Sequence, residues 1–272
     1  MIEFSKEYFS VKDTLECGQV FRFKPYKQGY LIMSMDKLAY VYEEGDKVII
    51  DGDDYFYNYF DLDRDYKKIV DSVIAYNIPA ITEACQNHKG IRILKQSRYE
   101  ALISFMISQN NNIPRIKSII ERLCENLGEK RGYNGIDYYA FPTLEKLASK
   151  NEDFYKSMGL GYRAEYIEKA AISLLNGEID LNKLGNLSTI ELRKALLKIK
   201  GIGEKVADCA IFFGFGRTDS FPVDTWIEKF YREDLKGELQ DRKKISNELV
   251  AKFKENSGYV QQYVFHSKRN KN

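Results

Sequence analysis

The stretch Leu196–Trp226 reads LLKIKGIGEKVADCAIFFGFGRTDSFPVDTW, and it contains the features that decide the fold. A Gly-Ile-Gly turn stands between two segments with helical apolar spacing, which predicts a helix, a tight turn and a second helix. Lys205 lies two residues after the second glycine, and Asp224 follows an apolar run near the end of the stretch. A phosphate cradle, an amine and a carboxylate are therefore expected close together, which points to covalent chemistry on DNA.

The first helix of this hairpin starts with a capping box. Ser188 and Glu191 have the spacing at which the serine side chain accepts from a first-turn amide while the glutamate reaches back. Apolar residues then recur every three or four positions, and Gly201 ends the helix because glycine tolerates positive φ. The second helix is expected to begin near Glu204, so that the helix-hairpin-helix covers about residues 189–214.

The turn itself has the properties of a phosphate site. The amides of Gly201–Lys205 lie at the start of the second helix, where unpaired N–H groups and the helix dipole favour an anion. Gly201 and Gly203 carry no side chain, so a phosphate can approach the backbone closely. Two plainer interpretations stay open, namely a helix-turn-helix corner with a solvated lysine, and DNA binding without catalysis.

Lys205 and Asp224 favour catalysis over these alternatives. An amine attacks only in its unprotonated form, so a lysine nucleophile needs surroundings that disfavour its charge; burial in the first turn of a helix would do this. Asp224 can stabilise positive charge on a deoxyribose or assist a proton transfer. It can also serve as the N-cap of a helix over Thr225–Arg232, and the two roles are compatible.

The first fifty residues are typical of an antiparallel sheet, and most of the remainder is typical of helices. Three short β-rich runs are separated by turn residues, at Tyr30–Met35, Leu38–Glu43 and Lys47–Asp51. Residues 55–88 have helical spacing with a break near Pro79. A second capping box at Ser97–Glu100 precedes helical patterns that dominate to the end of the chain.

Composition limits where DNA can bind. The formal net charge is only +2, so a DNA-binding face must be a local basic patch. Candidates are Lys198, Lys200 and Lys205, with Lys268, Arg269 and Lys271 in the tail. No apolar run reaches the length needed to cross a membrane and no signal peptide is visible, so we expect a cytoplasmic protein that associates with the nucleoid through DNA.

The four cysteines are too scattered for a zinc or iron–sulfur site and suit reduced thiols. Many endonuclease III-like relatives end in a four-cysteine cluster motif, which this chain lacks. We therefore expect no metal ligands among the cysteines.

Six segments resemble the 8-oxoguanine DNA glycosylase/AP lyases of the helix-hairpin-helix DNA glycosylase superfamily. The segments GIGEKVADCA and PVDTW match the lysine-bearing branch of the superfamily. The narrower resemblance rests on GQVFRF at 18–23, FMISQNNNIPR at 105–115, MGLGYRA at 158–164 and GYVQQYVF at 258–265, which follow the family's order. The resemblance implies an α+β, mostly α fold: an N-terminal antiparallel sheet domain with helices over residues 1–90, then a helical glycosylase core of two lobes over 91–272.

The resemblance also assigns roles in base flipping, which costs about a few kcal/mol in lost stacking. It implies that Asn110 enters the space that the base vacates and that Tyr162 wedges beside it. Arg115 and Arg163 would hold the orphan cytosine, whose acceptors suit guanidinium donors. Without the resemblance, these residues would be read as a polar turn and surface arginines.

Lesion recognition is assigned in the same way. The resemblance places the Gly18 carbonyl at N7, which is a donor in 8-oxoguanine and an acceptor in guanine. Gln261 would bind the Watson–Crick edge, and Phe265 and Cys209 would sandwich the base. Taken alone, Gly18 would be a turn glycine, and Phe265 and Cys209 would be core residues. A buried mismatch at N7 would cost on the order of 1–3 kcal/mol.

The predicted function is that of a bifunctional glycosylase acting on double-stranded DNA with 8-oxoguanine opposite cytosine. Lys205 would attack C1′ while Asp224 stabilises the sugar cation, and the resulting Schiff base would lead to a strand nick by β-elimination. We expect a monomer that requires no cofactor or catalytic metal, with a possible structural cation at the hairpin carbonyls. A related glycosylase for another oxidised base and a non-catalytic DNA-binding module remain alternatives.

Two residues depart from the family pattern. Trp226 stands where some members have a phosphate-contacting histidine, and Glu165 stands where some relatives carry a basic residue. The first departure puts one phosphate contact in doubt. The second would weaken DNA affinity or discrimination at the opposite base.

Overall fold

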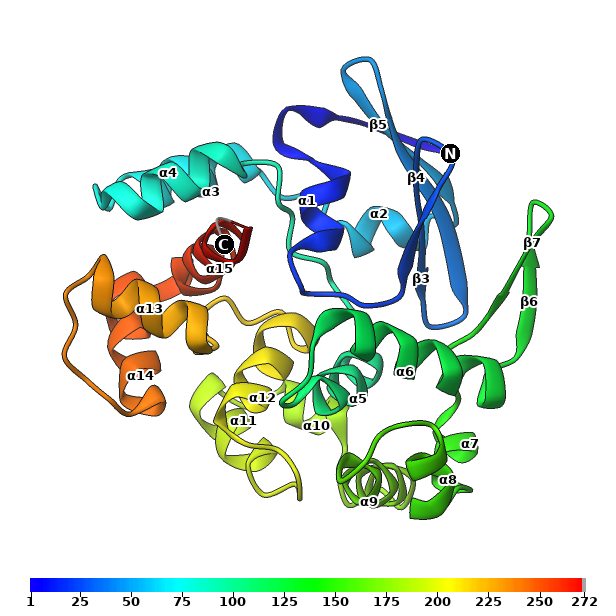
Figure 1. Ribbon diagram of the computed structural model, residues 1–272. Helices are drawn as coiled ribbons and strands as arrows, with labels where there is room; N and C mark the ends of the chain where they lie inside the picture. Colours follow the sequence, from blue (N-terminus) through cyan, green and yellow to red (C-terminus); the bar gives the residue numbers. More distant parts are fainter. Residues whose placement is uncertain (271–272) are drawn as a thin grey trace.

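The chain folds into an antiparallel sheet set on a larger helical body (Figure 1). The computed structural model describes residues 1–270, so Lys271 of the basic tail lies outside the described part. The sheet has the strand order β1-β5-β4-β3-β2. In chain order the strands are β1 (Ile2–Ser5), β2 (Phe23–Tyr26), β3 (Gly29–Ser34), β4 (Lys37–Glu44) and β5 (Lys47–Gly52). The predicted α+β, mostly helical fold is confirmed.

The three strands predicted from sequence are β3, β4 and β5, each found within two residues of its expected ends. The sequence analysis missed β1 and β2. Both are only four residues long and lie at the two edges of the sheet, and β2 contains Pro25. A proline is tolerated on an edge strand because its missing N–H breaks no ladder bond, but it hides the strand from a sequence pattern.

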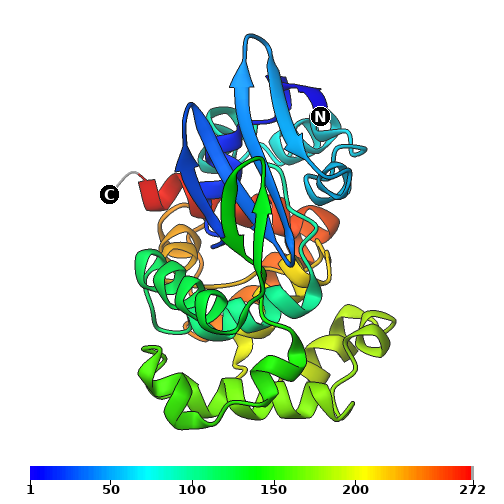
Figure 2. The same ribbon diagram turned by 90° about the vertical axis from the view of Figure 1, so that its right-hand side faces the viewer.

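A buried apolar cluster joins one face of the sheet to the short helices α1 (Val11–Glu16) and α2 (Tyr55–Tyr59). The other face is partly covered by a hairpin of β6 (Lys130–Tyr133) and β7 (Ile136–Tyr139). Figure 2 shows this hairpin standing in front of the sheet.

The β6–β7 hairpin was not predicted from the sequence, although helices dominate from residue 97 onward as expected. Its turn is Asn134-Gly135, and both residues have positive φ, 49° and 77°. This dipeptide is a strong sequence signal for a two-residue hairpin turn. Tyr133 Oη donates to Asp51 at 2.9 Å and Tyr138 Oη donates to the Asp36 carbonyl at 2.8 Å, which ties the hairpin to the sheet.

The helical body begins with α3 and α4, which divide the expected helical segment at Pro79. This proline is the first residue of α4, where its missing N–H costs nothing. The longer helices are α3 (Tyr66–Ile74), α4 (Pro79–Asn87), α5 (Arg98–Ser108), α6 (Ile113–Leu127), α9 (Arg163–Leu175), α11 (Thr189–Leu196), α13 (Thr225–Glu233), α14 (Arg242–Phe253) and α15 (Ser257–Asn270). Shorter ones are α7 (Leu144–Ala148), α8 (Glu152–Ser157), α10 (Leu181–Gly185) and α12 (Glu204–Cys209).

Helices from both ends of the chain share one core. The residues of α5 from Glu100 to Ser108 are all buried, which places this helix at the centre. In Figure 1, α15 lies between α4 on one side and α13 and α14 on the other. Residues of α3, α4, α5 and α15 all belong to the main apolar cluster, together with residues of most other helices. The division at residue 90 stays a prediction.

A buried ion pair connects α5 to the sheet. Arg22 Nη1 lies 3.2 Å from Glu100 Oε1, and both side chains are at least 92% buried. Glu100 Oε2 also accepts from the Met35 amide at 2.6 Å. Ser97 caps α5 as predicted, but Glu100 bonds to the sheet instead of returning to Ser97, so the expected capping box is only half formed.

We expect Glu100→Ala to lower the free energy of unfolding by about 3–5 kcal/mol, because it leaves the Arg22 charge buried without its partner. Urea unfolding measures this change. Glu129→Ala is the matched control, since the Glu129–Arg131 pair is exposed and such pairs contribute about 0–1 kcal/mol. Equal losses in the two variants would contradict the prediction.

Candidate active site

The helix-hairpin-helix forms with one change at the end of its first helix. The capping box of Ser188 and Glu191 is present as predicted. Helix α11 ends at Leu196, however, and hydrogen-bonded turns replace the expected continuation to Gly201. Gly201 has φ +87°, and a Cβ there would lie 2.3 Å from Tyr166 Cγ. A side chain at this position is therefore excluded by both conformation and contact.

An ion-pair network fixes α12 against α11. Arg193 on α11 pairs with Asp208 and Glu204, both on α12. Asp208 is only 3% exposed, and burial raises the pKa of its carboxyl to about 7 against the lowering effect of Arg193. Ser246 of α14 donates to the same carboxylate at 3.5 Å. The orientation of α12, which carries Lys205 and Cys209, is set by these contacts.

A single turn of π-helix, Ala210–Gly214, directly follows Cys209. Such turns are rare and often occur at functional sites. This one brings the Phe213 ring against Phe105 of α5, with the ring centroids 5.2 Å apart. Both rings line the cavity that Cys209 faces. The sequence pattern alone predicted an ordinary helix here.

A cavity of about 660 Å³ opens between α12, α15 and the loop that joins α5 to α6. All six residues that the sequence analysis assigned to catalysis and base binding line this cavity, together with Asn110. They are Gly18, Asn110, Lys205, Cys209, Asp224, Gln261 and Phe265. These positions span nearly the whole chain, and the fold brings them to one cavity.

Lys205 is exposed at the start of α12. The burial expected for this lysine is therefore not found in the protein without DNA. Asp224 is the N-cap of α13, as the sequence allowed. Its Oδ1 accepts from the Trp226 and Ile227 amides, each at 3.0 Å. Both cap bonds end on Oδ1, so the cap does not occupy Oδ2.

The walls of the cavity suit a flat base. Gly18 has φ +83°, and a Cβ there would lie 3.2 Å from Phe265 Cε1, so its backbone approaches the ring closely. Burial raises the pKa of the Cys209 thiol to about 12, which keeps this side chain neutral. Gln261 is 5% exposed, and its buried Oε1 has no hydrogen-bond partner among residues 1–270.

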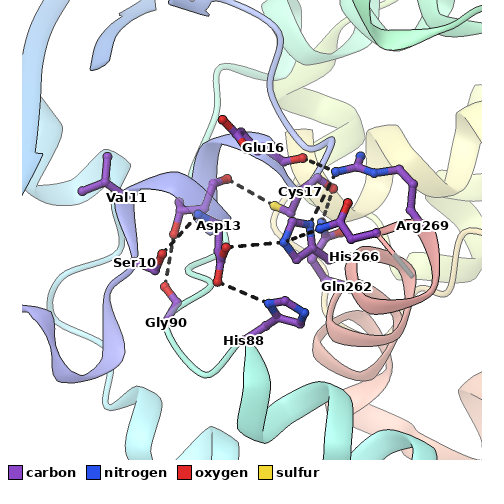
Figure 3. A network of polar contacts seen from close by, with 12 residues as sticks. Ser10, Val11, Asp13, Glu16, Cys17, His88, Gly90, Gln262, His266 and Arg269 are labelled. Carbon is purple, nitrogen blue, oxygen red and sulfur yellow. Dashed lines mark hydrogen bonds and ion pairs between the residues drawn. The ribbon is translucent and has the colours of Figure 1, made fainter. Parts of the chain in front are cut away.

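Polar contacts hold α15 against the end of α1, close to Gly18 (Figure 3). Gln262 Nε2 donates to the Cys17 carbonyl at 2.6 Å, and Arg269 Nη2 donates to the Glu16 carbonyl. His266 Nε2 lies 3.5 Å from Asp13 Oδ1. These three α15 side chains tie the helix to the residues that directly precede Gly18.

Both histidines of the chain meet at one carboxylate in this junction. His88 Nδ1 lies 3.3 Å from Asp13 Oδ2, and the nitrogen and oxygen atoms of Asp13, His88 and His266 lie within 4.8 Å of one another. Burial raises the pKa of Asp13, but hydrogen bonds from His266 and His88 lower it further, to well below its usual range. The sequence analysis considered only cysteines as metal ligands and overlooked this cluster. The four cysteines are free thiols.

Of the residues assigned to the opposite strand, Asn110 lines the cavity and Arg115, Tyr162 and Arg163 do not. Tyr162 is 52% exposed, and Arg115 is also exposed. Arg163 is only 3% exposed and donates to the carbonyls of Gln109 at 2.7 Å and Asn110 at 2.9 Å. In the free protein Arg163 thus holds the loop that carries Asn110. For Arg163 to contact an orphan cytosine, its hydrogen bonds to the Gln109 and Asn110 carbonyls would have to be replaced by hydrogen bonds to the base.

The two residues that depart from the family pattern, Trp226 and Glu165, have well-defined surroundings. Trp226 lines the cavity next to Asp224. Glu165 forms ion pairs with Lys169, at 2.7 Å, and with Lys200 in the hairpin turn. Their hydrogen bonds lower the pKa of Glu165 to about 2. Arg269, which was predicted from the sequence only as a basic residue of the tail, also lines the cavity.

Two family models together match residues 1–255. One is described as "8-oxoguanine DNA glycosylase, N-terminal domain" and matches residues 1–102; the other, "HhH-GPD superfamily base excision DNA repair protein", matches residues 103–255. The chain belongs to the 8-oxoguanine DNA glycosylase family. The predicted family is therefore confirmed. Separately, none of the helices in residues 1–270 is long and apolar enough to cross a membrane.

Two solved structures are similar to this chain over nearly its full length. An 8-oxoguanine glycosylase/lyase from Clostridium acetobutylicum, bound to double-stranded DNA with cytosine opposite 8-oxoguanine, is 33% identical with a TM-score of 0.93. The match covers 100% of this chain and 98% of that one. A 3-methyladenine DNA glycosylase from Archaeoglobus fulgidus has a TM-score of 0.80 at 15% identity, with 99% of both chains covered. This second likeness shows the fold alone.

A curated relative is the "N-glycosylase/DNA lyase" of Saccharomyces cerevisiae. It is 33% identical over 207 residues, which cover 72% of this chain and 54% of the yeast protein. The chain therefore spans about half the length of this relative.

Proposed function

We propose that this chain excises 8-oxoguanine from double-stranded DNA and then nicks the strand through a lysine Schiff base. The observation that carries the proposal is the shared cavity, where an amine, a carboxylate and the walls of a base-sized slot meet. Lys205 and Asp224 line it together with Gly18, Cys209 and Phe265. A module that only bound DNA would need no such amine and carboxylate at the end of a base pocket.

In this proposal, the enzyme distinguishes 8-oxoguanine from guanine by the hydrogen atom on N7 of the lesion. The Gly18 carbonyl accepts from N7–H of 8-oxoguanine, whereas guanine would present a lone pair at N7. Phe265 and Cys209 contact the two faces of the base, and the unpaired Oε1 of Gln261 accepts from the N–H groups of its Watson–Crick edge. In a dry pocket the mismatch with guanine would cost on the order of 1–3 kcal/mol.

Catalysis follows from the flipped base. The bond from C1′ to the base breaks, the base leaves with its electron pair and takes up a proton, and Asp224 stabilises the positive sugar. The Lys205 amine bonds to C1′ and loses protons as the sugar ring opens to a Schiff base. This imine acidifies the C2′ proton, and its removal expels the 3′ phosphate, which nicks the strand on that side.

The remaining parts of the proposal concern partners. The substrate is double-stranded DNA with cytosine opposite the lesion, and Asn110, Tyr162, Arg115 and Arg163 serve that strand. Gly201 and Gly203 bind a backbone phosphate through the amides at the start of α12. The chain acts as a monomer without a redox cofactor or catalytic metal, and a cation at the hairpin carbonyls would assist phosphate binding only.

Base release from a matched duplex panel tests the proposal. Single-turnover excision is measured with 8-oxoguanine, thymine glycol, 3-methyladenine or undamaged guanine opposite the appropriate partner. We expect fast release of 8-oxoguanine and at least about 5-fold slower release of every other base, which is the lower end of what a buried hydrogen-bond mismatch gives. Preferred release of thymine glycol would favour the alternative of a glycosylase for another oxidised base. Tight binding without release of any base would favour the non-catalytic DNA-binding module.

A further inference from the structure

Three side chains at four-residue intervals on α15 face the same cavity. They are Gln261, Phe265 and Arg269, and all three line its wall. Each step of four residues advances about 6 Å along a helix and stays on one face. Gln261 and Arg269 therefore lie on opposite sides of the Phe265 ring. A base stacked on that ring would present one edge to Gln261 and the opposite edge to Arg269.

Arg269 is held in place by contacts that leave one guanidinium nitrogen, Nη1, without a hydrogen-bond partner among residues 1–270. Its Nη2 donates to the Glu16 carbonyl and lies 3.5 Å from His266 Nδ1, and its guanidinium carbon lies 5.2 Å from the centroid of the Phe265 ring (Figure 3 shows the first two partners). Its Nη1 is buried and has no hydrogen-bond partner within residues 1–270. Leaving a buried donor unpaired is costly, and a ligand acceptor would remove that cost.

The unpaired Nη1 points to the place where the Gly18 backbone meets the ring. A Cβ on Gly18 would lie 3.2 Å from Arg269 Nη1 and 3.2 Å from Phe265 Cε1, so the three residues converge at one end of the cavity. If the Gly18 carbonyl reads N7 of the base, then Arg269 stands next to C8. Arginine only donates hydrogen bonds, so it requires an acceptor at that position.

We propose that Arg269 Nη1 donates a hydrogen bond to the C8 oxygen of 8-oxoguanine and is a specificity-determining residue of this enzyme. The inference rests on the proposed function, because it takes the lesion and its orientation from there. The lesion differs from guanine by a donor at N7 and an acceptor at C8. Gly18 and Arg269 supply the complementary acceptor and donor side by side, whereas guanine leaves both unpaired.

The test combines a protein variant with a substrate variant. Single-turnover excision is measured for 8-oxoguanine and for 8-thioguanine, which keeps N7–H but replaces the C8 oxygen by sulfur, a weak acceptor. We expect the wild type to excise 8-oxoguanine about 10–100-fold faster, the range for a charged hydrogen bond. Arg269→Met should excise 8-oxoguanine more slowly than the wild type by this factor, while its excision rate on 8-thioguanine should change little. The preference of the wild type for 8-oxoguanine over 8-thioguanine should therefore disappear.

Two further variants separate recognition from packing. Asp13→Asn loosens the same junction of α1 and α15 away from the cavity, and it should slow both substrates by the same factor. Arg269→Gln keeps a neutral donor and should retain part of the preference; it replaces Arg269→Met if the methionine variant does not fold. Equal slowing of both substrates by the Arg269 variants would overturn the inference and leave Arg269 as a tether. Failure of the wild type to excise 8-oxoguanine would instead overturn the proposed function.

Discussion

Replacing Lys205 by glutamine is expected to abolish the covalent adduct that borohydride traps on DNA with 8-oxoguanine opposite cytosine. An amide nitrogen is not nucleophilic, while glutamine suits a helix and is close to lysine in length. Loss of a nucleophile removes most of the catalytic acceleration, so we expect base excision to slow by at least about 10³-fold. Binding of the duplex should persist, because the amides around Gly201 and Gly203 remain at the start of α12.

Lys198→Gln is the matched control for this experiment. Lys198 is another exposed lysine of the hairpin turn, but it lines a separate groove that it shares with Lys200. Its replacement removes one positive charge near the same DNA face and leaves the cavity intact, so excision should change less than about 3-fold. A trapped adduct that survives in Lys205→Gln would assign the nucleophile to another amine. Base release without any adduct in the wild type would make the enzyme monofunctional.

The parts of the site that sequence could predict are those decided by local spacing. Ser188 and Glu191 form a capping box because three residues separate them, and Gly201 has positive φ because the turn requires it. The position of Asp224 before an amphipathic segment likewise predicts an N-cap, which the structure confirms. The roles of Gly18 and Gln261 came only from the family resemblance. Nothing within a few residues of either one indicates a base pocket.

The parts that sequence could not predict depend on contacts between distant segments. Arg269 looks like a residue of a solvated basic tail until α15 is seen against α1, where Glu16 accepts its hydrogen bond. Asp13 and the two histidines lie in three separate segments and meet only in the folded chain. The hairpin turn at Asn134-Gly135 is a different case. Its signal was present in the sequence and was overlooked among the helical patterns around it.

Asp224 has two roles that a pair of substitutions can separate. Asparagine is as good an N-cap as aspartate but carries no charge, whereas alanine removes both properties. We expect both variants to lower the single-turnover excision rate by about 10²–10³-fold, the scale for losing electrostatic stabilisation of a charged transition state. Only Asp224→Ala should also lower the free energy of unfolding, by about 1 kcal/mol. Excision assays and urea unfolding of the same preparations measure the two effects.

The asparagine variant decides what the carboxylate does. Both cap bonds end on Oδ1, so an asparagine carbonyl can accept them from Trp226 and Ile227 and keep α13 in place. Any loss of excision in Asp224→Asn then reflects the missing negative charge beside the sugar and not a displaced helix. Full activity in this variant would mean that the charge is not used, and Asp224 would be a structural cap only. The positive sugar would then need stabilisation from elsewhere in the cavity, such as the base as it leaves or a DNA phosphate.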